Sequence, residues 1–152
     1  MEVLSATANP TVYPPAIDAE HLQIERTLGQ LCTAVADPAR LRESEPLLRQ
    51  LVREIGAHFA HEERLMQASR YAEFAWHKRQ HGAARRLVKE LVSQFAQGDP
   101  GAISPLLESI GAWLTTHIGV ADSMASSHLR NYEREIGARG RAGATRNVKR
   151  PQ

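Results

Sequence analysis

The chain has 152 residues, of which 42% are hydrophobic and 24% are charged. This length and composition suit one globular domain with its own core, and they exclude a chain that is disordered throughout. The single cysteine, Cys32, excludes intrachain disulfides and metal sites built from several thiolates.

The net charge of +2 is unevenly distributed along the chain. Residues 129–152 carry seven Arg or Lys and two Glu, a net charge of +5, which leaves −3 on residues 1–128. Because the body is slightly acidic, we expect no nucleic-acid binding. The N-terminus lacks the basic start and apolar run of a signal peptide, and no apolar run reaches membrane-spanning length. We therefore expect a cytoplasmic protein without a membrane span.

The first predicted helix follows an extended arm, residues 1–16, in which Tyr13-Pro14-Pro15 resists helix formation. Asp18 is the predicted N-cap of this helix. Its apolar stripe has helical spacing and ends before the break at Asp37-Pro38. The stripe consists of Ile24, Leu28, Leu31, Cys32 and Val35.

Three more stripes with helical spacing follow, and no segment shows the two-residue alternation of a strand. The third stripe ends at the turn signal Gln97–Gly101. The sequence therefore predicts an all-α protein, an antiparallel up-down four-helix bundle over residues 17–130. The Gly- and Arg-rich residues 131–152, the basic tail, are predicted to be disordered. We interpret the tail as a solubilising end in preference to a nucleic-acid or membrane contact, and it could also contact a protein partner. The apolar stripes comprise Leu47, Leu48, Leu51, Ile55, Phe59, Leu65 and Met66; Phe74, Ala84, Val88, Leu91 and Phe95; and Ile103, Leu106, Ile110, Trp113, Leu114 and Ile118.

Each of the four stripes carries a histidine, and two also carry or adjoin a carboxylate, at positions where leucine would be usual. A buried carboxylate without a partner costs several kcal/mol, so these groups either face solvent at the edge of the stripe or converge on a positive charge. A lone His–Glu pair on a helix is more often a surface pair, but five inward histidines on four helices favour a shared metal site. Two more histidines, His61 and His128, are expected to face solvent, with the alternative that His61 supports a metal ligand from outside. The candidate ligands are His21, His58, Glu62, His77, His81, His117 and Asp122.

The spacing of the candidate ligands indicates how they could share a site. His58 and Glu62 are four residues apart, as are His77 and His81, which places each pair on one side of a helix. The third spacing, from His117 to Asp122, is five residues and requires a locally widened helix such as a π-helical turn.

The donor set favours iron over other metals. Five imidazoles and two bridging carboxylates fill nine coordination positions, and an oxo or hydroxo bridge between two ions raises this to eleven. Two octahedral ions need twelve, so one position stays open for a small ligand. Zinc prefers four ligands, and calcium or magnesium prefers oxygen, whereas imidazole-rich sites of high coordination number suit iron.

The order of these residues resembles the hemerythrins, particularly the single-domain bacterial ones, over roughly residues 12–128. The matching motifs are His21, then His58-Phe59-Ala60-His61-Glu62-Glu63, then His77-x-x-x-His81, then His117-Ile118-x-x-x-Asp122. The resemblance implies that His77, His81 and His117 hold one iron. His21 and His58 would hold the other, Glu62 and Asp122 would bridge both, and dioxygen would bind at the open position of the second iron.

The resemblance also implies an oxygen pocket next to the irons. Its lining would be apolar, which slows proton-assisted loss of the bound ligand, although the same residues also suit plain core packing. The expected function is reversible dioxygen binding for storage, delivery or sensing, by a monomer that is not an enzyme. The alternative is a di-iron oxidase, a peroxidase or an iron-handling protein, although the Glu-x-x-His pairs of ferritin-like enzymes are absent from the sequence. The predicted pocket residues are Ile24, Phe59, Trp113, Leu114 and Ile118.

Overall fold

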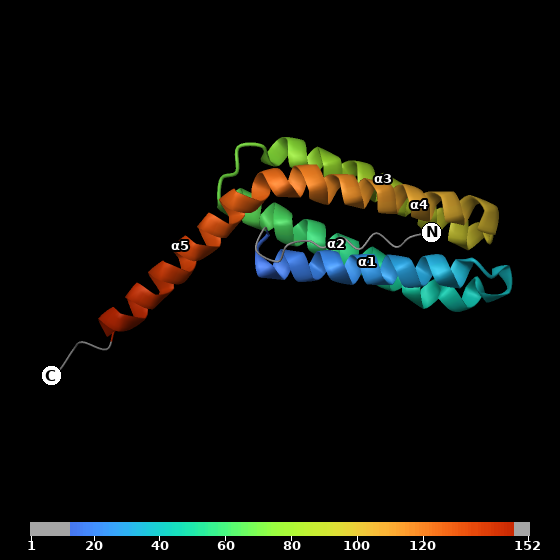
Figure 1. Cartoon of the computed structure of the whole chain (residues 1–152), viewed down its shortest axis with the longest axis horizontal. Coiled ribbons are helices and arrows are strands. Elements are labelled where there is room, and N and C mark those ends of the chain that lie inside the picture. Colours follow the sequence, from blue (N-terminus) through green and yellow to red (C-terminus); the bar gives the residue numbers. More distant parts are fainter. Residues whose placement is uncertain (1–12, 148–152) are drawn as a thin grey trace.

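The computed structural model describes residues 13–147, in which helices are the only regular secondary structure. Figure 1 shows the first four helices lying side by side as a bundle, with the last helix projecting from one end. The predicted helical bundle is confirmed at this level. The helices are α1 (Pro15–Val35), α2 (Glu45–Ala68), α3 (Phe74–Gln97), α4 (Pro100–His117) and α5 (Ser123–Asn147).

Three shorter helical segments connect these helices. Two 3-10 turns, η1 (Pro38–Arg40) and η2 (Arg42–Ser44), lie between α1 and α2. A π-helical segment, η3 (Ile118–Asp122), joins α4 to α5 without a break. The widened helix predicted between His117 and Asp122 is therefore present.

The start of α1 lies two residues earlier than the sequence predicted. Pro15 occupies the first helical turn, where its missing N–H has no partner to lose. Asp18 is not the N-cap, because its own N–H already donates to the Pro14 carbonyl at 3.1 Å. Its carboxylate instead lies in the positive first turn of the helix. Of the predicted arm, residues 1–12 lie outside the described residues.

The breaks between helices follow the predicted turn residues. Asp37 accepts a hydrogen bond from the Ala39 N–H at 3.0 Å and so begins η1. Gly98 ends α3 in the left-handed conformation, with φ 73°, which glycine adopts without a Cβ clash. Asp99 then caps α4 by accepting the Gly101 N–H at 3.0 Å.

The main core runs along the bundle and contains residues from all four helices. Most of its deeply buried side chains lie on the predicted stripes, which confirms their inward orientation, although Leu107 is buried where the sequence predicted Leu106, and Ile17 belonged to no stripe. Burying one such side chain stabilises the fold by about 1.5–3 kcal/mol. Burial of a whole stripe therefore outweighs the cost of burying single polar side chains within it. Examples with no more than 1% exposure are Ile24, Leu31, Leu51, Leu91 and Ile103. No helix of residues 13–147 combines the length and hydropathy that crossing a membrane would require.

The expectation of a disordered tail is wrong for residues 131–147, which continue helix α5. Ala, Arg and Glu are good helix formers and extend a helix that has already begun, despite the intervening glycines. Ala125 and Leu129 attach α5 by packing on Met66, and His128 donates to the Ser69 carbonyl at 3.1 Å. Residues 148–152 lie outside the described residues.

Removing residues 137–152 should leave the melting temperature unchanged, because the side chains of 138–143 are exposed. Thermal unfolding followed by circular dichroism measures this. The control is Leu129→Ala, which removes a side chain that is 2% exposed and should destabilise the fold by about 2–5 kcal/mol. A clear fall in melting temperature after truncation would show that the end of α5 packs on the bundle.

Candidate metal centre

Seven ionisable side chains lie together in the interior of the bundle. Each is at most 4% exposed, although their residue types are normally found at the surface. They come from every helix of the bundle and from η3. The structure thus brings all seven candidate ligands together: His21, His58, Glu62, His77, His81, His117 and Asp122.

The first group combines three imidazoles with both carboxylates. One ligand atom from each of its five members lies within 4.8 Å of all the others. The Nε2 atoms of His77 and His81 lie 3.3 and 3.1 Å from Glu62 Oε2. Asp122 Oδ1 lies 3.2 Å from His77 Nε2 and 3.0 Å from His117 Nε2.

The second group combines the other two imidazoles with the same carboxylates. His21, His58, Glu62 and Asp122 also offer ligand atoms within 4.8 Å of one another. His21 Nε2 lies 3.0 Å from Asp122 Oδ2, and His58 Nε2 lies 3.7 Å from Glu62 Oε2. Glu62 and Asp122 therefore belong to both groups, and each lies between the two sets of imidazoles.

The π-helical turn brings Asp122 to this position. In an ideal α-helix, residues five apart point about 140° away from each other. The widened turn of η3 inserts one extra residue, and Asp122 then lies on the same side as His117, 3.0 Å from its Nε2 atom. Without this turn, the carboxylate would face away from the other ligands.

Several of the buried ligand atoms lack hydrogen-bond partners among the described residues. These atoms include the Nε2 atoms of His21 and His58 and both carboxylate oxygens of Asp122. Asp122 lies about 3 Å from three imidazole nitrogens, yet the geometry of these contacts does not form hydrogen bonds. A buried carboxylate left in this way would be costly, whereas ligands of a common ion approach one another closely without bonding. The residues present therefore fit a metal centre.

The two carboxylates are held ionised, as metal ligands must be. Burial raises the pKa of Glu62, and so does the nearby Asp122. Contacts with the imidazoles of His77 and His81, and the charge of His58, outweigh both effects and lower the pKa of Glu62 from 4.5 to about 2. Burial likewise raises the pKa of Asp122, but the imidazoles of His117, His21 and His77 hold it well below the usual value.

Two further carboxylates fix the orientation of the imidazoles from outside. Glu20 lies 3.0 Å from His58 Nδ1, and Glu63 lies 3.0 Å from His81 Nδ1. A carboxylate can only accept here, so each Nδ1 carries the hydrogen and each Nε2 lone pair stays available to a metal. These two roles were missed, although Glu20 and Glu63 directly adjoin the candidate ligands His21 and Glu62 in the sequence.

His61 and His128 are half-buried rather than exposed, and the suggestion that His61 supports a ligand from outside agrees with its contact to Glu20. His61 is half-buried, and its Nδ1 donates to Glu20 at 2.7 Å, so that Glu20 joins His61 to His58. The other residue, His128, is half-buried against the α2–α3 connection. The sequence could not show either contact, because both partners lie far away along the chain.

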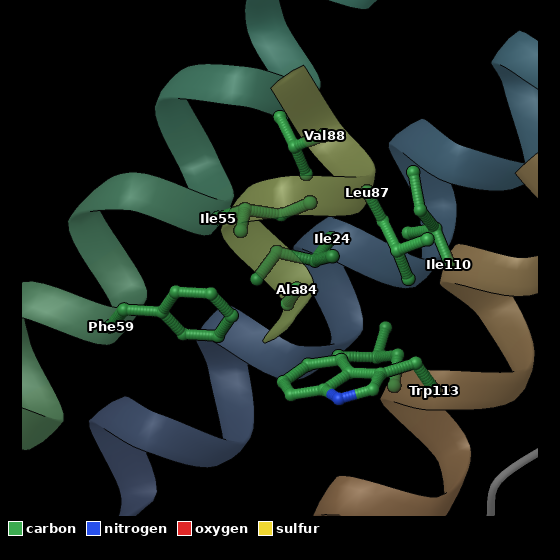
Figure 2. A pocket seen from close by; sticks show the side chains of 9 residues that line it. Ile24, Ile55, Phe59, Ala84, Leu87, Val88, Ile110 and Trp113 are labelled. Carbon is green, nitrogen blue, oxygen red and sulfur yellow. The ribbon is translucent and has the colours of Figure 1, made fainter. Parts of the chain in front are cut away.

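Aromatic rings and an apolar pocket adjoin the ligands on the side of the core. Phe59 stacks on His81 with ring centroids 4.0 Å apart, and Trp113 stacks on His117 at 4.4 Å. Figure 2 shows both rings beside aliphatic side chains that surround a small pocket. Four of the five predicted pocket residues line it: Ile24, Phe59, Trp113 and Leu114. Ile118 does not line it, although it is buried.

Comparisons with known proteins agree with this arrangement. The family model described as Hemerythrin HHE cation binding domain matches residues 15–126. A bacteriohemerythrin of Stenotrophomonas maltophilia (strain R551-3) is 31% identical over 134 residues, which cover 85% of this chain and 86% of the relative. No solved structure gave a significant match.

The stability of the metal-free protein should depend on pH through His77. Burial lowers the pKa of His77, but Asp122 and Glu62 raise it more strongly, from 6.5 to about 9. A raised pKa stabilises the fold fully below pH 6.5, and this contribution disappears as the pH rises through 9. Urea unfolding should therefore show a midpoint that falls between pH 6.5 and 9. The variant His77→Gln should reduce this dependence on pH. A wild-type midpoint that rises over the same range would contradict the raised pKa of His77.

Proposed function

The chain belongs to the hemerythrin family, and on this basis we propose that it binds dioxygen reversibly at a non-haem di-iron centre, for oxygen storage, delivery or sensing. The observation that carries the proposal is the pair of ligand groups that share Glu62 and Asp122. Two groups joined by two common carboxylates suit two ions held close together, whereas a single-ion site has no use for shared ligands.

In this proposal each group holds one iron. His77, His81 and His117 would hold the first, His21 and His58 the second, and both carboxylates would bridge them. The groups contribute three and two imidazoles, so an open position would lie at the second iron, which His21 and His58 would hold. Iron suits this donor set because imidazole is the main ligand and the chain offers no thiolate cluster.

The surroundings of the candidate ligands support binding over turnover. Iron in this site would supply the electrons that dioxygen accepts on binding. The side chains of the adjoining pocket are apolar, with the Trp113 indole N–H as their one polar group, so water and mobile protons are kept away. Phe59 and Trp113 also cover the faces of His81 and His117, which limits the movement of these imidazoles. A dry and rigid surround favours release of the ligand unchanged.

The remaining parts of the proposal concern the organisation of the chain. The antiparallel up-down order is supported by short connections, residues 36–44, 69–73 and 98–99. We place the oxygen-binding domain at residues 17–130 and assign the basic tail no part in it, except as a possible contact for a protein partner. We also propose that the protein acts as a monomer in the cytoplasm.

The metal content should test the first part of the proposal. Purified wild-type protein should contain about two irons per chain. Glu62→Ala and Asp122→Ala should each lose most of this iron and lower the melting temperature, because a shared ligand serves both ions and its loss leaves buried imidazoles unpaired. Glu90→Ala, at an exposed position of α3, is the matched control and should change neither value. A fully stable wild-type protein with one zinc and no iron would refute the assignment.

Optical titration should test reversible oxygen binding. The reduced protein should gain a visible charge-transfer band in air and lose it when oxygen is removed. Leu114→Gln should admit water to the pocket and speed decay to the oxidised form. The same substitution at exposed Leu22 is the control and should leave the decay rate unchanged. Steady oxygen consumption with an added reductant, far faster than this decay, would instead support the oxidase alternative.

A further inference from the structure

Tyr13 is a buried phenol at the start of the described chain, just before α1. Only 5% of the residue is exposed. Its hydroxyl donates a hydrogen bond to the Ile118 carbonyl at 2.7 Å and lies 3.0 Å from Ser123 Oγ. Tyr13 therefore links the beginning of the chain to both ends of η3, more than a hundred residues away.

The acceptor of this hydrogen bond is a carbonyl that takes part in the π-helical hydrogen bonding. In an α-helix, the Ile118 carbonyl would accept the N–H of Asp122, four residues on. In η3 it accepts the N–H of Ser123, five residues on. The Ser123 hydroxyl also reaches it, at 3.1 Å. Three donors thus meet at one oxygen, and this arrangement requires Ser123 to lie where only the widened turn places it.

The same turn decides where Asp122 points. If residues 118–122 reverted to an α-helix, Asp122 would rotate by about 100° relative to His117 and leave both ligand groups. Tyr13 contacts the second ligand group directly as well, because its ring edge packs on His21 with centroids 5.2 Å apart. One side chain therefore touches both His21 and the segment that positions the carboxylate beside it.

We propose that Tyr13 is a positioning residue for the metal centre, because its hydroxyl holds η3 in the π-helical form that directs Asp122 towards the other ligands. Pro14 and Pro15 follow immediately and restrict the backbone, so little entropy is lost in holding the phenol in place. The inference rests on the proposed di-iron site for its functional meaning, while the effect on the helix stands on the contacts alone.

The test compares Tyr13→Phe, which removes only the hydroxyl, with Tyr132→Phe. The control makes the same change at a half-buried tyrosine of α5. Hydrogen exchange of the amides in residues 118–123 is measured in the iron-free and iron-loaded full-length protein. Tyr13→Phe should speed exchange of these amides about tenfold, as loss of one buried hydrogen bond does, and leave the core amides of α1–α3 unchanged. Tyr132→Phe should change neither.

A second measurement follows the iron itself. Tyr13→Phe should release iron to a chelator about tenfold faster than the wild type and shift the visible spectrum of the loaded site, because Asp122 is held less firmly. Ser123→Ala should act in the same direction. In the double variant, the rate of iron release should rise by less than the product of the two single increases, because both hydroxyls bind one carbonyl.

The positioning role of Tyr13 is wrong if Tyr13→Phe behaves like Tyr132→Phe in the exchange of amides 118–123. It is also wrong if the two variants agree in their iron-release rate and visible spectrum. If exchange rises equally across the whole bundle, Tyr13 contributes only general stability, and the role is likewise wrong. If the wild-type protein binds no iron, the proposed function fails, and exchange in the iron-free chain alone then decides whether Tyr13 holds the turn.

Discussion

Five imidazoles and two carboxylates occupy the interior of an otherwise apolar bundle, and the need to compensate their polarity constrains the rest of the structure. Ionised groups removed from water are tolerated only when opposite charge or hydrogen bonds replace the lost solvation. Here the carboxylates lie among the imidazoles, while several ligand atoms still lack partners. One cation in each group would satisfy them all at once. This explains why at least one ligand comes from each of α1–α4, since no single helix could surround such ions.

The bundle meets this constraint by two different local means. On α2 and α3, ligands four residues apart share one side of a regular helix, so ordinary helical geometry is enough. Between the end of α4 and η3, the ligands His117 and Asp122 are five residues apart, and the helix itself is widened at Ile118–Asp122. Such a turn is less favourable than a regular one and needs support from additional contacts. The contacts at the Ile118 carbonyl are the ones that the structure provides.

The two sides of the site differ in polarity, and the difference matters for the proposed function. Towards the surface, Glu20 and Glu63 bind the outer nitrogens of His58 and His81 and reach partly exposed His61 and Arg85. Towards the core, the neighbours are aromatic or aliphatic and line a pocket without charges. Polar support can therefore hold the ligands without bringing water to the side where a small apolar molecule would arrive. An arrangement of this kind suits a gas ligand better than a charged one.

The sequence alone determined the helical elements, their breaks and the seven inward polar positions, because hydrophobic periodicity and residues such as Gly98 act locally. The spacing between His117 and Asp122 even indicated the widened turn. The role of these side chains as metal ligands stays a prediction, although the structure brings them together. Tertiary structure alone decided the contacts of Tyr13, Glu20 and Glu63, since their partners are 18 to 110 residues away and no periodicity encodes such pairs. The helical course of residues 131–147 was also missed, because Gly-rich composition suggests disorder while the preceding helix, anchored by Leu129, favours continuation.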